Sequence, residues 1–298
     1  MKKYKICKIL LVILAIFLCV AFYELLGICV AYKKQPEVSN TTKKETKNGS
    51  WNECSENTER AVIIEKNPEA LLQRVRLIKN AKKEIILSTF AFQSDESGKL
   101  ILGALHDAAD RGVHIRLLVD GMESWIDMEG NPYFYGLSSH ENVEIKLYNK
   151  ANPLKPWKMM GRMHDKYLIA DGKRYILGGR NTYNYFLGDF PGHKNYDRDV
   201  LVVCDEPEKE NSVNQLLEYF ETIWEQEDSG YFHDNKKLAN RKSVKNAVLE
   251  LQNGYQKYFE ENKERICDTD YTDETFETEK IALVSNPIHT GSKEPVVW

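Results

Sequence analysis

The chain has 298 residues, of which 42% are hydrophobic and 29% are charged, and its net charge is −4. This composition predicts a packed globular core and excludes a disordered or low-complexity chain. The first 32 residues carry a net charge of +3, so the remaining residues carry −7. Because lysine and arginine supply the affinity for a phosphate backbone, this acidic remainder argues against a general nucleic-acid-binding protein.

The first predicted element is an apolar run at residues 9–32 that is interrupted only by Glu24. As a helix the run measures about 36 Å, which is enough to cross a hydrocarbon core of about 30 Å. Four lysines precede the run and two follow it, a distribution that predicts an amino terminus inside the cell. We interpret residues 1–34 as a single-pass anchor in the cell membrane, with the rest of the chain on the extracytoplasmic side. The alternative is a cleaved signal peptide, with the cleavage site at residues 29–31.

Residues 35–60 are polar and charged, as in a flexible stalk. After them, apolar segments with strand character alternate with segments of helical periodicity, which predicts an α/β fold with a mixed β-sheet flanked by helices. The predicted strands lie at 61–65, 84–92, 114–121, 143–149, 163–170 and 197–205. The predicted helices lie at 67–78, 97–112, 207–226 and 235–266. Residues 122–142 are predicted to be a loop, and the acidic runs 205–210 and 268–279 to be solvated surface.

The last segment, 281–298, opens with strand character and then stops. A lone strand has no new partner against which to bury its apolar face. We therefore interpret 61–280 as one domain and 281–298 as the start of a second lobe that is missing from the chain.

The stretch 163–181, MHDKYLIADGKRYILGGRN, gathers polar side chains around a predicted hairpin. Side chains alternate along a strand, so His164 and Lys166 are expected to share a face. Asp171 and the glycine after it form a hairpin turn signal, and the returning strand brings Asn181 back toward His164. The two glycines at 178–179 let a substrate approach the backbone closely.

This arrangement suits attack on a phosphorus atom. A neutral imidazole is a competent nucleophile near pH 7, which assigns that role to His164. Lys166 and Asn181 are expected to hold the non-bridging oxygens while charge redistributes in the transition state. The sequence offers no second residue that would complete a metal site at this position.

Several stretches of the chain resemble one known family. HDKYLIAD together with GGRN resembles the HKD motif of the phospholipase D superfamily. RMHDK, YDRDVLVV and the segment from Ser88 to Gly121 are similar to the bacterial cardiolipin synthase-like branch. The resemblance covers about residues 61–298 and implies a phospholipase D-like lobe.

The resemblance also implies roles for individual residues. His164 would form a phosphohistidine intermediate or protonate the leaving alcohol, and Asp171 would orient the motif. Asp199 is the best match for the carboxylate that steadies the histidine, with Asp197 second. The expected phosphate-binding residues are Lys166, Asn181, Gly179 and Arg162. The family uses no metal and no organic cofactor in this step.

Active members of this superfamily bring two such motifs face to face, whereas this sequence has one. The resemblance therefore implies either a homodimer or a partner that carries a second HKD-containing half. The first functional hypothesis is a phosphatidyltransferase or phosphodiesterase acting on phospholipid at the membrane, such as one that makes cardiolipin and glycerol from two phosphatidylglycerols. The alternatives are a homodimeric phosphodiesterase or nuclease, and an inactive half that binds lipid or a second half. Phospholipid and membrane are the expected partners, and nucleic acid is not.

The stretch 152–162, NPLKPWKMMGR, lies just before the motif and combines a tryptophan with lysines. These residue types suit a membrane interface, so the stretch is either a lip that touches lipid headgroups or a loop that packs over the site.

Overall fold

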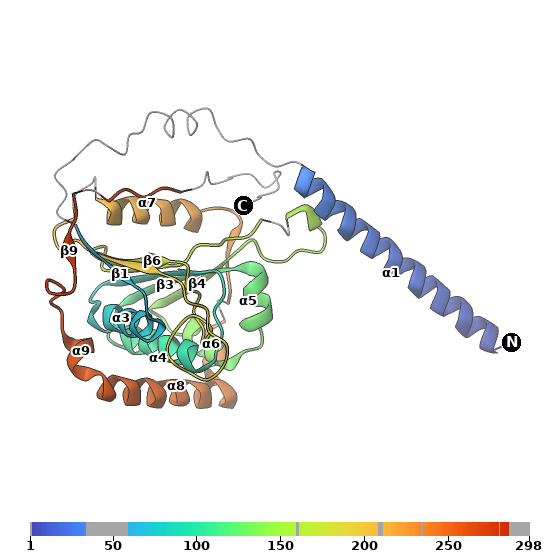
Figure 1. Ribbon diagram of the computed structural model, residues 1–298. Coiled ribbons are helices and arrows are strands. Elements are labelled where there is room, and N and C mark those ends of the chain that lie inside the picture. The colour runs from blue at the N-terminus through green and yellow to red at the C-terminus, as the bar shows by residue number, and fades with distance from the viewer. Residues whose placement is uncertain are drawn as a thin grey trace.

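Figure 1 shows the computed structural model, in which residues 2–33, 59–158, 161–207, 211–233, 235–279 and 281–285 are described. The predicted stalk lies outside these residues except for its last two positions. Residues 286–298 of the predicted second-lobe segment also lie outside them.

One mixed sheet organises the domain, as the alternation of elements predicts. Its nine strands run in the order β8-β4-β3-β2-β5-β6-β7-β1-β9. The parallel part is β2 (Glu84–Thr89), β3 (His114–Asp120) and β4 (Val143–Tyr148). The antiparallel additions are β1 (Arg60–Ile64), β5 (Tyr167–Ala170), β6 (Arg174–Gly178), β7 (Asp199–Val203), β8 (Ser229–Tyr231) and β9 (Phe276–Glu277).

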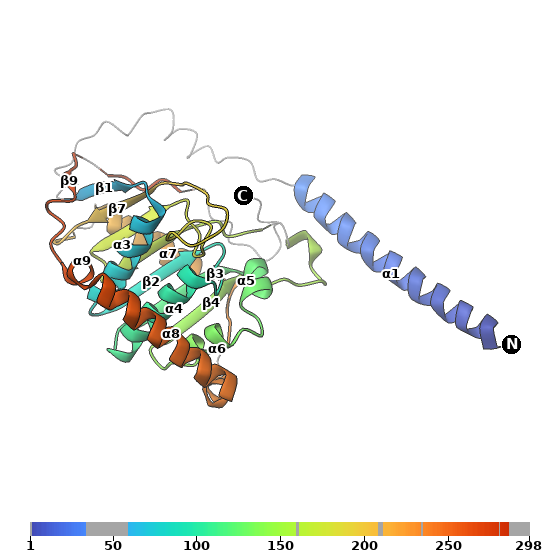
Figure 2. The ribbon, with the colours of Figure 1, turned by 60° about the horizontal axis from the view of Figure 1, so that its bottom comes forward.

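Helices cover both faces of this sheet (Figures 1 and 2). One face carries α3 (Asn67–Asn80), α4 (Glu96–Asp110), α6 (Pro132–Ser138) and α8 (Lys242–Glu261), while α7 (Ser212–Trp224) lies on the other. The larger core lies under the four helices and includes Ile101, Leu105 and Ile115, all fully buried. The smaller core lies under α7 and is rich in aromatic side chains.

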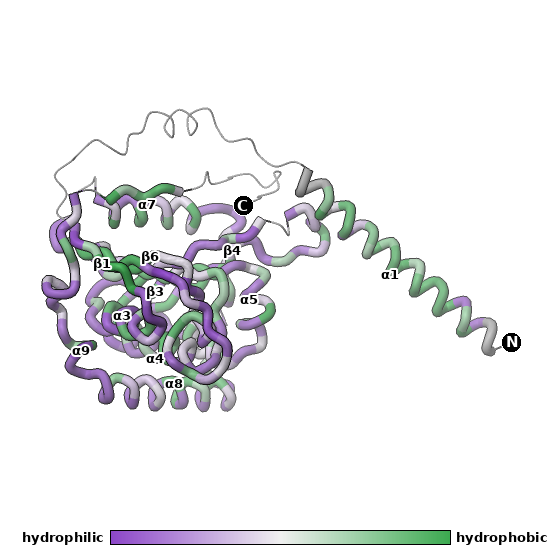
Figure 3. Tube along the Cα trace, viewed as in Figure 1, coloured by the Kyte–Doolittle hydropathy of each residue, from purple (hydrophilic) through white to green (hydrophobic). Residues whose placement is uncertain are grey.

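Helix α1 (Lys2–Lys33) extends away from the domain and is apolar along most of its length (Figure 3). Its apolar span, Lys5–Cys29, is long and hydrophobic enough to cross a membrane, and a signal sequence at the amino terminus has the same properties. The span has no buried residues. Membrane association through this helix is therefore compatible with the structure.

The segment predicted to be a loop, 122–142, instead forms α5 (Gly121–Asp127) and α6. Each helix has an N-cap side chain that accepts backbone N–H groups of the first turn, Asp120 for α5 and Asn131 for α6. Such caps stabilise helices that are too short to show a clear periodicity in the sequence.

The strand prediction is also wrong at two places. Strand β5 begins at Tyr167, so His164 and Lys166 precede it, although the Gly178 N–H still donates to the Lys166 carbonyl (3.1 Å). Residues 281–285 are not in the sheet: the Leu283 N–H donates to Gln215 on α7 (2.9 Å). Leu283 packs against the core under α7, which explains its apolar character without a strand.

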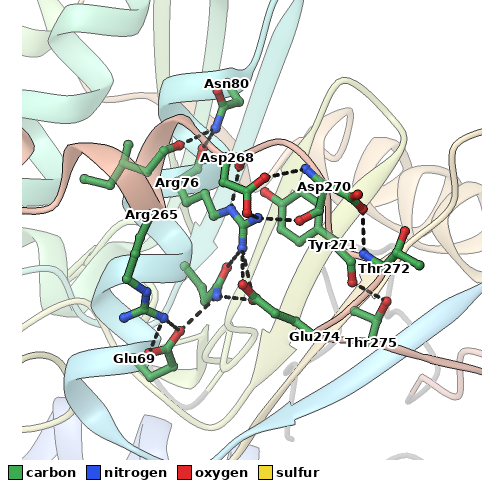
Figure 4. Close-up of polar contacts among 12 residues, drawn as sticks. Glu69, Arg76, Asn80, Arg265, Asp268, Asp270, Tyr271, Thr272, Glu274 and Thr275 are labelled. Atoms are coloured by element: carbon green, nitrogen blue, oxygen red, sulfur yellow. Dashed lines mark hydrogen bonds and ion pairs between the residues drawn. The ribbon is translucent and has the colours of Figure 1, made fainter.

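The acidic run after α9 (Lys263–Cys267) is not simply solvated surface (Figure 4). Arg76 of α3 is 1% exposed, donates to the carbonyls of Asp268 and Asp270, and pairs with the Glu274 carboxylate at 3.0 Å. Its guanidinium also stacks 3.9 Å from the centre of the Tyr271 ring. A buried arginine needs several acceptors at once, and the segment after α9 supplies them. These contacts therefore hold that segment against α3.

Candidate functional site

The motif residues open onto a cavity of about 730 Å³ beside the start of β5. The cavity lies where the carboxyl ends of β2 and β3 meet the polypeptide that enters β5. It is lined by Phe90, Arg162, His164, Asp165, Lys166, Tyr167, Leu177, Gly178, Leu216, Tyr219 and residues 283–285. The end of the described chain thus forms part of the wall, together with α7.

Phe90, the residue after β2, lies at the centre of the charged groups. The ring of His164 meets it edge to face at 4.7 Å between centroids. Lys166 Nζ lies 5.3 Å and Arg162 Cζ lies 4.9 Å from the centre of the same ring. An aromatic face attracts cations and restricts the rotamers that pack on it, so Phe90 collects three basic side chains at one wall of the cavity.

The electrostatic surroundings keep His164 neutral. Partial burial lowers the pKa of the imidazole, and the positive charges of Lys166 and Arg162 lower it further. Asp120 acts in the opposite direction on that pKa. An imidazole whose pKa lies below its ordinary value is mostly unprotonated at pH 7, which is the form that attacks an electrophile.

Lys166 is 6% exposed, and its ammonium donates to the His164 carbonyl at 2.7 Å. Burial lowers the pKa of Lys166 to about 8, although the carboxylates of Asp165, Asp197 and Asp120 oppose this shift. The residue therefore remains mainly charged near pH 7. A negatively charged ligand in the cavity would restore part of the interaction that burial removes.

Asp120, at the end of β3, holds the polypeptide that leads into His164. Its side chain is 1% exposed, and Oδ2 accepts the Met163 N–H at 3.0 Å. Oδ1 accepts Arg162 Nε at 2.9 Å, and the other end of that guanidinium reaches Glu123 at 2.8 Å. Arg162 thus lines the cavity but is already paired with two carboxylates.

Asn181 binds the backbone of the residue that follows Phe90. It is 7% exposed, and its Oδ1 accepts the Ala91 N–H at 3.2 Å. This bond orients the carboxamide and leaves Nδ2 as its donor. Asn181 is not among the residues that line the cavity, so its expected contact with phosphate oxygens stays a prediction.

The two glycines of the motif face carboxylates. A Cβ atom at Gly178 would overlap the Asp199 carboxylate, and one at Gly179 would overlap that of Asp197. Gly178 borders the cavity, whereas Gly179 does not. The absence of side chains at 178–179 therefore makes room for Asp199, the first residue of β7, and for Asp197 just before that strand.

Two predicted site residues lie elsewhere. Asp171 follows β5 at the end opposite His164, where its carboxylate accepts the backbone N–H groups of Lys82, Lys83 and Glu84. Its φ of 55° fits the tight turn that the sequence predicts. Asp171 thus fixes the β5–β6 hairpin to the start of β2.

Asp199, the first residue of β7, is buried and pairs with two arginines. Arg74 Nη1 lies 2.9 Å and Arg180 Nη1 lies 3.3 Å from Asp199 Oδ2. All three side chains are 5% exposed or less. Among the described residues, no hydrogen bond or ion pair joins Asp199 to His164, and the role predicted for Asp199 in steadying that histidine stays a prediction. The negative charge of Asp197 acts on the pKa of Lys166, whereas the carboxylate that acts on the pKa of His164 is Asp120.

Asp165, which lies between His164 and Lys166 in the motif, forms a hydrogen-bonded pair with Tyr219. The Tyr219 hydroxyl on α7 donates to Asp165 Oδ2 at 2.8 Å, and both residues line the cavity. Burial raises the pKa of the Asp165 carboxyl, and the pKa of Tyr219 is also raised, first by burial and then by Asp165.

Phe90, Asp120 and the Asp165–Tyr219 pair are not among the site residues predicted from the sequence. A signal for the first two was available, because each lies within the last three residues of a predicted strand, near the carboxyl ends where ligand sites of parallel sheets gather. No such signal marks Tyr219. Among the described residues, no group of three or more His, Cys, Asp or Glu side chains is placed to hold a metal ion.

Comparisons with known proteins identify the family of the chain. Residues 74–224 match the family model described as "Cardiolipin synthase, PLD-like domain". An uncharacterized protein of Helicobacter pylori strain J99 is 30% identical over 212 residues, which cover 66% of this chain and 39% of that protein. Cardiolipin synthase C of Escherichia coli K12 is 29% identical over 171 residues, which cover 53% of this chain and 34% of the enzyme.

Among solved structures, phosphatidylserine synthase of Haemophilus influenzae superimposes with a TM-score of 0.48 at 17% identity, over 74% of this chain and 48% of that one. The chain thus spans less than half the length of these proteins. The family model includes the whole HKD motif and extends over just over half of the 298 residues. The chain therefore belongs to the phospholipase D superfamily, as a protein with a PLD-like domain related to those of the cardiolipin synthases.

Proposed function

We propose that the chain is a membrane-anchored phosphatidyltransferase that makes cardiolipin and glycerol from two phosphatidylglycerols. The observation that carries the proposal is that His164 and Lys166 line one open cavity and pack on the same Phe90 ring. The apolar span of α1 supports a lipid substrate, since it would hold the cavity near a bilayer.

In the first step a ring nitrogen of His164 attacks the phosphorus of one phosphatidylglycerol. A bond from nitrogen to phosphorus forms, the bond from phosphorus to the glycerol oxygen breaks, and glycerol leaves after accepting a proton. Lys166 stabilises the charge on the non-bridging oxygens, because a desolvated ammonium interacts strongly with an anion. Arg162 adds positive potential at the same wall of the cavity.

In the second step the glycerol hydroxyl of another phosphatidylglycerol attacks the phosphohistidine. The new oxygen–phosphorus bond replaces the bond to His164, and the hydroxyl proton goes to a base. A second HKD motif, from another copy of the chain or from a separate half, would supply the acid and base. Asp197 would orient the Lys166 ammonium.

The test is mass spectrometry of lipids from a host that lacks its own cardiolipin synthases. We expect cardiolipin in cells that express the chain, and a loss of about 1,000-fold or more in activity for His164→Ala, as for other catalytic nucleophiles. His114→Ala is the matched control, since His114 lies at the opposite end of β3 and is 44% exposed.

Three other outcomes would contradict the proposed reaction. If phosphatidic acid forms in place of cardiolipin, the site hydrolyses phosphatidylglycerol and does not transfer the phosphatidyl group. Cleavage of plasmid DNA by the purified chain, with phosphatidylglycerol unchanged, would favour the nuclease. No product from either substrate would contradict activity of the chain on its own and favour an inactive half.

A further inference from the structure

The loop at residues 151–158, between β4 and the motif, contacts the end of the apolar helix α1. The Tyr23 hydroxyl donates to the Leu154 carbonyl at 2.9 Å. A Cβ atom at Gly27, one turn further along α1, would overlap the ring of Pro156. Figures 1 and 2 both show the loop reaching out from the domain to this end of the helix.

The contact lies within the span that is apolar enough to cross a membrane. That span, Lys5–Cys29, has 25 residues and therefore measures about 37 Å, against a hydrocarbon core of about 30 Å. If the span is centred in the core, about 4 Å of helix protrudes at each end. Gly27 is then level with the edge of the core, and Tyr23 lies about 6 Å inside it. The loop is thus at the boundary between acyl chains and headgroups.

The face of α1 that meets the loop differs from the rest of the helix. Side chains 5–23 are exposed, whereas Glu24, Gly27 and Ile28 are partly buried and share one face, as residues three and four apart do. Glu24 Oε2 is fully buried. A carboxylate in an apolar span is costly in lipid, so the face of α1 that carries Glu24 is expected to lie against protein and not against acyl chains.

The loop carries side chains of the types that are common at membrane interfaces, and its base is fixed to the domain. Leu154 is 78% exposed, Lys155 is exposed and Trp157 is half-buried, a combination that suits the headgroup region. At the base of the loop, Lys158 is 7% exposed and its Nζ binds Asp228 at 2.6 Å.

We propose that residues 151–157 form a membrane-contacting loop that seats the domain on a phospholipid surface beside α1. The loop leads within a few residues to Arg162 and His164, so its position sets the distance between the cavity and the headgroups. This role concerns the lipid surface alone and does not depend on which reaction the site performs.

The test uses the full chain in lipid nanodiscs, with an environment-sensitive fluorescent amino acid in place of Leu154. The matched control carries it in place of Leu249, a 57% exposed leucine on α8, far from α1. We expect blue-shifted emission at position 154, and quenching by lipids spin-labelled near the headgroup about twofold stronger than by lipids labelled deep in the chain. Position 249 should show neither effect.

Emission and quenching at position 154 no different from those at position 249 would overturn the proposal. A second pair of variants tests the contact with the helix. Gly27→Val places a side chain where Pro156 lies, and we expect quenching at position 154 to fall to about half. Ala21→Val, on an exposed part of the same helix, should leave it unchanged. Equal quenching in both variants would contradict the part of the proposal that assigns the seating of the loop to α1.

Discussion

The reactivity that we propose for the site depends on three side chains that lie together at one partly buried wall of the cavity. Phe90 brings His164 and Lys166 to the same ring, and burial lowers the pKa of both. For the histidine this favours the nucleophilic form. For the lysine it moves the loss of charge toward neutral pH, since a buried ammonium is less stable than a hydrated one.

The two shifts predict a bell-shaped dependence of kcat/KM on pH. Activity should fall as the pH decreases below 6.5 through the lowered pKa of His164, because the imidazole gains a proton there. It should also fall as the pH rises through about 8, because Lys166 loses its proton there. Beyond each limit the rate should change about tenfold per pH unit.

The variant Lys166→Arg tests whether Lys166 causes the loss of activity at alkaline pH. A guanidinium keeps its charge to a pH of about 12 or higher, so the variant should lose the fall near pH 8 even if its maximal rate is lower. Lys173→Arg, an exposed lysine in the β5–β6 turn, is the control and should keep the wild-type profile. An unchanged alkaline limb in Lys166→Arg would show that another group titrates there.

At the scale of elements, Asp199 connects β7 to α3 and to the residues after β6. Arg74 comes from the helix, Arg180 follows the strand that pairs with β7, and all three side chains are buried. Two buried cations need this anion, because an unpaired buried charge is far more costly than the pair. The geometry favours a structural role for Asp199.

Asp199→Asn should therefore reduce the free energy of unfolding by about 3–5 kcal/mol, measured by urea denaturation, because two guanidinium groups lose their counter-charge. Glu65→Gln is the control, since Glu65 and its partner Arg198 are 64% and 73% exposed. The control should cost about 1 kcal/mol or less. A stable Asp199→Asn protein with a large loss of kcat would instead restore Asp199 to the catalytic machinery.

At the scale of the whole molecule, one motif in an open cavity implies a second contributor to the reaction. The cavity wall includes residues 283–285, where the described chain ends. The proposed phosphohistidine mechanism needs an acid that protonates the leaving alcohol. We expect the chain on its own to obtain that acid by pairing with a second copy.

Mixing tests this pairing. Wild-type chain and His164→Ala, both in the same liposomes at a fixed total amount, form mixed pairs that lack one of the two histidines. In an equal mixture about one quarter of the pairs are fully wild-type, so we expect about one quarter of the activity. A value of about one half would show that each chain acts independently of its copies.

The spacing of residues along the sequence determined the type of fold, the position of the site and one turn beside it. Alternating apolar segments predicted the mixed sheet and its flanking helices, because the burial of one face has a different period in strands and helices. The HKD spacing predicted a site at His164 and Lys166, which the structure places at one cavity. The turn at Asp171 followed from the preference of Asp-Gly for positive φ.

Only the tertiary structure decided which distant residues meet. The contacts of Asp199 with Arg74 and of Asp120 with Met163 join residues 125 and 43 positions apart, and no spacing rule specifies them. Phe90 became part of the site because β2 lies next to β5 in the sheet. Side-chain chemistry is thus encoded locally, whereas the partners that tune it depend on the order of strands, which packing of the whole sheet selects.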